Sequence, residues 1–252
     1  MIELRNVTMS YGADPVVKNV SFNLADSGLT ALIGPNGAGK STLLSGIGRL
    51  IPLADGQVLV DDIDVKDWKS EELAKKIAIL RQENHLSVRL TVAELVMLGR
   101  HPHGRGRIGQ EDQEKVAEAL KSVDMLCLAD RFLDELSGGQ RQRAFIAMTL
   151  AQDAKYLLLD EPLSALDMRH SRDMMRHLVR ATKNQNMSTV VVIHDINTAS
   201  AYADRLIALK DGEVVADGTP DDVVRPEVLE DIFEVDVEVV HVNGRPVAVP
   251  LA

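Results

Sequence analysis

The chain has 252 residues, of which 45% are hydrophobic and 26% are charged, values typical of one globular domain or of one large domain with a small lobe. This composition excludes a disordered tail, a collagen-like rod and a disulfide scaffold. Asp and Glu (38) outnumber Lys and Arg (28), and the formal net charge of −10 makes the chain a poor candidate for general nucleic-acid binding. The net charge does not exclude a local basic patch that binds nucleic acid.

The single cysteine and the apolar runs indicate a compartment. Cys127 has no internal partner for a disulfide and cannot by itself build a zinc site. We expect a buried thiol in a reducing compartment, with a reactive nucleophile as the alternative. The amino terminus lacks the apolar core of a signal peptide, and no run approaches the ~18 apolar residues of a membrane span. These features predict a cytosolic chain whose membrane role depends on a partner.

Apolar alternation and apolar runs predict β-structure around one helix in the first third of the chain. The expected strands are residues 20–24, 29–33, 57–60 and 77–80. A helix is expected within residues 37–50. Gly46 lies inside this helix at a cost of about 1 kcal/mol relative to Ala, and the sequence offers no reason for it.

Helical periodicity dominates from about residue 90 to residue 151. Thr91, with Glu94 three positions on, predicts a capping box at its start. The apolar runs at residues 156–160 and 190–194 are typical of buried strands in a parallel sheet. Two hairpins follow, with tight turns predicted at Asp211-Gly212 and at Asn243-Gly244.

Residues 34–41 read GPNGAGKS and match the phosphate-loop pattern GxxxxGK[ST] between a predicted strand and a predicted helix. The glycines allow a tight turn whose N–H groups point inward, and the following helix adds its positive end. Lys40 is expected to bind the β- and γ-phosphates and Ser41 to bind Mg²⁺. The predicted cradle comprises Gly34, Pro35, Asn36, Gly37, Ala38, Gly39, Lys40, Ser41 and Thr42. Alone, this loop does not separate ATPases from GTPases or kinases.

Two carboxylates end the apolar run at residues 156–159. In a parallel sheet, strand carboxyl ends face the ligand crevice, so Asp160 is expected in the Mg²⁺ shell, through water. Glu161 is one residue further and is the candidate general base that polarises an attacking water. The alternative is a solvated acidic loop.

Residues 136–140 read LSGGQ and precede Arg141-Gln142-Arg143 and an apolar helix. Ser137 is a natural N-cap, and the two glycines leave the backbone beside it accessible. The pattern predicts a second anion site at a helix N-terminus. A lone SGG would indicate only a turn.

With these three motifs in order, the sequence resembles the ATP-binding subunits of ATP-binding cassette (ABC) transporters over essentially its whole length. Residues 34–41 match the Walker A motif, 136–140 the signature and 157–161 the Walker B motif. Gln82, residues 164–167 and His194 match the Q-loop, D-loop and switch histidine, and Tyr11 lies where the family keeps an adenine-stacking aromatic.

Each of these single positions also has a simpler interpretation. Tyr11 and His194 would be core residues, Gln82 a surface amide and Asp167 a helix cap. The matching order along the chain favours the family assignment.

The resemblance implies an α/β fold: a P-loop NTPase (RecA-like) core with an antiparallel β subdomain and an inserted α-helical subdomain. The whole chain, residues 1–252, would be one ABC ATPase domain with the helical lobe at about residues 91–152. ATP and Mg²⁺ are the implied cofactors. The implied catalytic residues are Glu161, His194, Gln82 and Lys40, and the implied metal residues are Ser41, Gln82 and Asp160.

Two copies of such a subunit would sandwich two ATP molecules head to tail. The signature of one copy would then contact the γ-phosphate held by Lys40 of the other. The residues implied on the signature side are Ser137, Gly138, Gly139, Gln140 and Asp167.

Residues 96–104 (VMLGRHPHG) and the tail are similar to ATPases that serve iron–siderophore, haem and cobalamin importers. This implies an ATPase on the cytoplasmic face of the inner membrane that energises import through polytopic permease subunits, indirectly with a substrate-binding protein and without nucleic acid. The alternatives are a cytosolic, non-transport cassette ATPase acting on nucleic acid or ribosomes, and a non-catalytic regulatory cassette.

Overall fold

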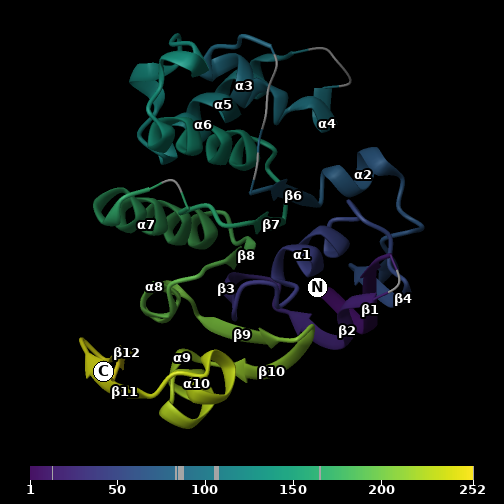
Figure 1. The fold of residues 1–252 in the computed structure, drawn as a ribbon. Helices are drawn as coiled ribbons and strands as arrows, with labels where there is room; N and C mark the ends of the chain where they lie inside the picture. The colour runs from purple at the N-terminus through teal and green to yellow at the C-terminus, as the bar shows by residue number, and fades with distance from the viewer. Residues whose placement is uncertain (13, 83, 85–87, 105–107, 165, 252) are drawn as a thin grey trace. The chain divides into compact units, whose positions relative to one another are not determined.

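The computed structural model describes residues 1–12, 14–82, 84, 88–104, 108–164 and 166–251 (Figure 1). The chain divides into two compact units. We call residues 1–68 with 188–252 the split unit and residues 69–187 the inserted unit. Within the described residues, no helix is long and apolar enough to cross a membrane.

The split unit holds most of the strands. Its elements before the insertion are β1 (Ile2–Tyr11), β2 (Asp14–Leu24), β3 (Gly28–Ile33), α1 (Lys40–Ile47), β4 (Asp55–Val60) and β5 (Ile63–Asp64). Its later elements are β8 (Ser188–Val192), α8 (Ile196–Tyr202), β9 (Arg205–Lys210), β10 (Glu213–Gly218), α9 (Pro220–Val223), α10 (Pro226–Phe233), β11 (Val237–Val242) and β12 (Arg245–Pro250). An antiparallel sheet has the order β2-β1-β4-β5.

The other strands of the split unit position the phosphate loop. They lie in the order β10-β9-β3-β8, with β3 parallel to both β8 and β9. In β3 all residues after Gly28 are buried, and β8 is buried throughout. Such two-sided burial explains their continuous apolar sequences, because both faces of a parallel sheet are covered. The loop leaves the carboxyl end of β3, where a parallel sheet presents its ligands.

The inserted unit is mainly helical (Figure 1). It contains α2 (Ser70–Ala74), β6 (Ile77–Leu80), α3 (Val92–Leu98), α4 (His101–Gly104), α5 (Gln110–Ser122), α6 (Gly138–Ala151), β7 (Tyr156–Leu159) and α7 (Met168–Asn184), with 3-10 turns at Leu126–Leu128 and Leu133–Glu135. β6 and β7 pair in parallel. The predicted capping box at Thr91 is confirmed, since Thr91 Oγ1 accepts from the Glu94 N–H and the Glu94 carboxylate accepts from the Thr91 N–H.

The predicted strands and the helix after the phosphate loop are confirmed, although β2 begins at Asp14, well before the start of the strand predicted at residues 20–24. Both predicted hairpins are present as β9-β10 and β11-β12. Their turn residues all have positive φ: 51° and 86° at Asp211 and Gly212, and 52° and 75° at Asn243 and Gly244. This is the geometry that makes Asp-Gly and Asn-Gly turns favourable between twisted strands.

Gly46 now has an explanation. A Cβ at this position would lie 2.3 Å from Cε of Met9, a fully buried residue of β1. The glycine lets α1 lie close to the antiparallel sheet, at the expense of helix propensity.

The expectation for Cys127 was wrong. Its thiol is exposed, on the 3-10 turn Leu126–Leu128, where Leu126 is also half exposed. A one-turn segment has no long apolar stripe, so periodicity gives no guide to which of its side chains is buried.

Candidate functional site

The phosphate loop is shaped by close packing at its first residue and by open space further along. Gly34 has φ 137°, and a Cβ there would lie 2.0 Å from the carbonyl oxygen of Leu209 in β9. Gly37 has φ 82°, but a Cβ there would meet no atom within 4 Å. The space beside Gly37 is consistent with a cradle that a ligand fills.

Lys40 is the first residue of α1 and is 5% exposed. Its Nζ donates to the carbonyl oxygens of Gly34 and Pro35, both at 2.8 Å, so the ammonium group lies across its own loop. The first turn of α1 has no acidic residue, which leaves the positive end of the helix dipole uncompensated by a carboxylate of that turn. Thr42 is buried and Ser41 is partly exposed at this helix start. The arrangement fits an anion such as a phosphate.

In the inserted unit, Gln82 and Glu161 are brought together. Gln82 Nε2 donates to Glu161 Oε2 at 2.9 Å, although 79 positions separate the two residues. Glu161 has φ 48°, a left-handed conformation that is uncommon for a residue with a side chain. Strained residues of this kind are concentrated at functional sites. Asp160, immediately before it, is 7% exposed, and its N–H donates to the carbonyl oxygen of Leu80 in β6.

The signature residues form the N-terminus of α6. The Ser137 hydroxyl accepts from the Gln140 N–H at 3.3 Å, and the Gln140 side chain accepts from the Ser137 N–H at 3.0 Å. A Cβ at Gly138 would meet no atom within 4 Å, whereas one at Gly139 would lie 2.9 Å from the Leu166 side chain. The cap fixes where the helix begins, and Gly138 leaves its first turn open to an anion.

Asp167 is a helix cap, as the simpler interpretation had it. Its Oδ1 accepts from the His170 N–H at 2.9 Å and lies 2.8 Å from His170 Nδ1. These bonds to His170, led by the backbone N–H, hold the pKa of Asp167 below its ordinary value. His170 was not among the predicted site residues, although its place three residues after an N-cap aspartate was a usable signal. A role of Asp167 toward a phosphate stays a prediction.

The remaining predicted site residues lie in the split unit. His194 follows the buried strand β8 and is exposed, which argues against a core histidine. Tyr11 ends β1 and pairs with Asp14, but its side chain is outside the described part of the structure. Ala165 of the predicted D-loop belongs to the inserted unit and lies outside the described residues.

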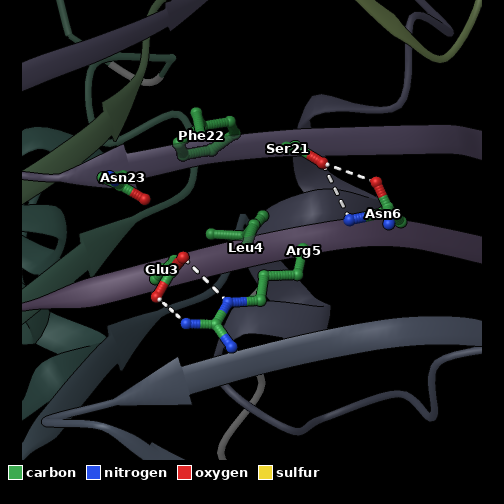
Figure 2. A pocket seen from close by; sticks show the side chains of 7 residues that line it. All are labelled: Glu3, Leu4, Arg5, Asn6, Ser21, Phe22 and Asn23. Atoms are coloured by element: carbon green, nitrogen blue, oxygen red, sulfur yellow. Dashed lines mark hydrogen bonds and ion pairs between the residues drawn. The ribbon is translucent and has the colours of Figure 1, made fainter.

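A shallow hollow of about 370 Å³ lies on β1 and β2, away from these motifs in the sequence (Figure 2). Residues 3–6 and 21–23 line it. Figure 2 shows two bonded pairs among its polar side chains: Arg5 donates to both carboxylate oxygens of Glu3 at 2.8 and 2.7 Å, and the Ser21 hydroxyl donates to the side-chain oxygen of Asn6. It contains none of the predicted site residues.

Comparison with known proteins identifies the family. The ABC transporter family model matches residues 17–164, a range that includes the phosphate loop, Gln82, the signature and the carboxylates that follow β7. The chain belongs to the ABC transporter family. It is an ATP-binding subunit and an ATPase, and its α/β, P-loop NTPase fold is as predicted.

Three relatives of this ABC protein show how far the similarity extends. The petrobactin import ATP-binding protein YclP of Bacillus subtilis (strain 168) is 43% identical over 99% of both chains. The ferric enterobactin transport ATP-binding protein FepC of Escherichia coli (strain K12) is 41% identical over 97% of this chain and 92% of its own length. The ATP-binding cassette MJ0796, solved as a dimer in a post-hydrolysis state bound to ADP and Pi, has a TM-score of 0.76 and 35% identity over 87% of this chain and 98% of its own.

Proposed function

We propose that this ABC ATPase energises a membrane importer of an iron–siderophore complex. The observation that carries the proposal is the near full-length similarity to ATP-binding proteins named for petrobactin import and ferric enterobactin transport. Those relatives narrow the expected cargo from metal chelates in general to siderophores.

The proposed reaction is hydrolysis of ATP held by the phosphate loop. Tyr11 stacks on adenine, and Lys40 with the N–H groups of residues 37–41 neutralises the phosphate oxygens. Glu161 orients the attacking water and takes its proton, while His194 donates to the γ-phosphate. These roles follow from the chemistry of each side chain together with its place in the family motifs.

Ser41, Gln82 and Asp160 are the proposed residues for Mg²⁺. A hydroxyl, an amide oxygen and a carboxylate are the hard oxygen donors that this ion prefers, so the donor set fits it. When bound, Mg²⁺ would neutralise charge on the phosphate oxygens. The bond from Gln82 Nε2 to Glu161 Oε2 at 2.9 Å links a proposed metal residue to the proposed base.

The proposed assembly is a pair of these chains on two permease subunits at the cytoplasmic face of the membrane. In the pair, residues 137–140 and Asp167 of one copy complete the phosphate site of the other. The dimeric state of the MJ0796 cassette supports this arrangement. A substrate-binding protein outside the membrane would deliver the cargo, and nucleic acid has no role. Residues 1–252 would act as one cassette, with residues about 91–152 as its helical lobe.

Glu161→Gln tests the catalytic assignment. We expect ATP binding to be retained and steady-state phosphate release to fall by about 10²–10⁴-fold, the usual contribution of a general base. Lys40→Ala is the matched variant for binding, and ATP affinity should be lost because the loop loses its only ammonium group. Turnover of Glu161→Gln within threefold of wild type would remove Glu161 from this role.

Cargo is tested in the cell. Deletion of the gene should abolish growth when a ferric siderophore is the iron source, while growth on haem or with cobalamin as the limiting nutrient is unaffected. The wild-type gene should restore growth, and the Lys40→Ala gene should not. Loss of growth on haem or cobalamin instead would reassign the cargo, and co-purification with ribosomes rather than with a permease would favour the cytosolic alternative.

A further inference from the structure

The carboxyl-terminal hairpin β11-β12 has two different faces. One face carries Pro246 and Ala248, and both of these residues are buried. Ser200 Oγ of α8 donates to the Pro246 carbonyl at 2.6 Å, and the Asn197 side chain makes two bonds with the Ala248 backbone, at 3.0 and 2.8 Å. These contacts anchor β12 on α8, so the opposite face of the hairpin points away from the anchor.

We call this opposite side the outer face. Its residues follow from the cross-strand pairs Glu238 with Val249, Val240 with Val247, and Val242 with Arg245. Leu251 continues the same alternation, and its N–H donates to the Asp236 carbonyl. The outer face is therefore apolar between two charged corners.

Four apolar residues of the outer face are exposed, and Val247 between them is half-buried. The exposed fraction is 39% for Val240, 51% for Val242, 43% for Val249 and 55% for Leu251. An antiparallel sheet with one wetted face normally places polar residues there, as alternation along each strand allows. A row of apolar side chains on a two-stranded hairpin instead indicates an interaction surface.

The two charges of the outer face lie at opposite corners. Glu238 is near the open end of the hairpin on β11, and Arg245 is at the turn end on β12. Arg245 is half-buried, and its Nη1 donates to the carbonyl oxygen of Ala203, which follows α8, at 3.3 Å, so one nitrogen of the guanidinium is tied toward the anchored side. If two such faces stack with strands antiparallel, each Glu238 comes beside Arg245 of the other face. If they stack parallel, like charges meet at both ends.

We propose that the outer face is a contact between two copies of this chain, stacked antiparallel about a twofold axis. This contact is isologous, so each copy supplies the same patch, and Val240 on the axis meets the partner's Val240. Two Glu238–Arg245 pairs close the ends. The sheets would pack about 10 Å apart, as in a β-sandwich.

The size of the face decides what the contact does. Its exposed side chains are too few to bury the roughly 800 Å² per partner that a stable interface buries. The contact therefore forms between copies that bound ATP has already brought together. The inference thus rests on the proposed function, which supplies the ATP-bound pair. Tethering of this kind makes a weak second contact effectively intramolecular.

Disulfide cross-linking of the full chain tests whether Val240 of one copy meets Val240 of the other. In a Cys127→Ser background, Val240→Cys should form a covalent dimer on mild oxidation, faster with ATP than without. Val215→Cys is the matched control, because Val215 is an exposed valine of similar exposure (42%) on β10. Cross-linking of Val240→Cys no faster than this control overturns the proposal, as does a cross-link to a permease subunit in the intact transporter.

A charge exchange tests the antiparallel register. Glu238→Lys should slow the Val240→Cys cross-link, and adding Arg245→Glu should restore it, because the two opposed pairs are re-formed. Absence of rescue overturns the register. Phosphate release by the Cys127→Ser parent separates the hairpin contact from the proposed function. If the parent hydrolyses ATP but Val240→Cys does not cross-link, only the hairpin contact is refuted. If Val240→Cys cross-links but the parent does not hydrolyse ATP, only the proposed function is refuted.

Discussion

At the residue scale, two glycines of the phosphate loop are required for different reasons. Gly34 faces the carbonyl oxygen of Leu209 at a distance that no Cβ tolerates, and this oxygen belongs to the backbone of a buried strand. Gly37 has room for a side chain but has φ 82°. The first position is constrained by packing in addition to its positive φ of 137°, and the second by backbone strain alone.

Alanine substitutions separate these causes. We expect Gly34→Ala to lower the free energy of unfolding by about 3 kcal/mol or more, because β9 or the loop must move. Gly37→Ala should cost only about 1–2 kcal/mol, the strain of a left-handed residue. Urea unfolding of both variants measures the difference, and equal losses would contradict this account of the loop.

At the element scale, a buried ion pair ties the link between α3 and α4 to the helices α5 and α6 of the inserted unit. Arg100 Nε donates to Asp112 Oδ1 at 2.9 Å, and Nη1 donates to the carbonyl oxygen of Ala151, the last residue of α6. The other Asp112 oxygen accepts from the Gly109 N–H at the start of α5. Both side chains are nearly inaccessible. Arg100 thus fixes the carboxyl end of the helix whose amino end carries the signature.

Breaking this pair should be costly, because the remaining charge is left buried. We expect Asp112→Ala to lower the free energy of unfolding by about 3–5 kcal/mol. Asp112→Asn, which keeps the shape and the cap acceptor, should be milder. Urea unfolding at pH 7 measures both, and a loss below 1 kcal/mol for Asp112→Ala would show that the pair contributes little.

The same pair predicts a pH dependence. Bonds from the Gly109 N–H and then from Arg100 lower the pKa of Asp112. A lowered folded-state pKa adds stability above the unfolded value of about 3.9, and this stability is lost as pH falls through the folded value. Between pH 7 and pH 3, wild type should therefore lose more stability than Asp112→Asn. Parallel pH profiles of urea unfolding would contradict the assignment.

At the scale of the whole molecule, the predicted site residues are distributed over both units. The phosphate loop and His194 lie in the split unit, whereas Gln82, Glu161 and the signature lie in the inserted unit. Under the proposed function, in which the signature comes from a second copy, one chain would not supply a complete pocket by itself.

Mixed pairs test this directly. Lys40→Ala and Ser137→Ala chains should each have little activity alone, because both pockets of such a pair lack one half. Mixing them should restore ATP hydrolysis, since one pocket of the mixed pair keeps both Lys40 and the facing Ser137. Phosphate release from the mixture against each variant alone is the measurement. Activity no greater than the sum of the two would mean that each pocket is built within a single chain.

Local features were the predictable ones. The GxxxxGK[ST] loop, the Thr91 and Ser137 caps and the two Gly-containing turns depend on residues within a few positions of one another, so pattern alone identified them. The prediction of a buried Cys127 was wrong, because the exposure of a side chain on a one-turn segment depends on the residues that lie near it in space. The roles of His194 and Tyr11 stay predictions.

The sequence by itself determined most of the strands, the helical stretch after about residue 90 and the presence of a nucleotide loop, because dihedral preferences and apolar periodicity are local properties of the sequence. Only the tertiary structure showed that Gly46 lies against Met9, that Gln82 bonds to Glu161 across 79 positions, and which valines of the last hairpin are exposed to solvent. Contacts between distant segments depend on how whole elements pack, and packing is a property of shape that no single stretch of sequence contains.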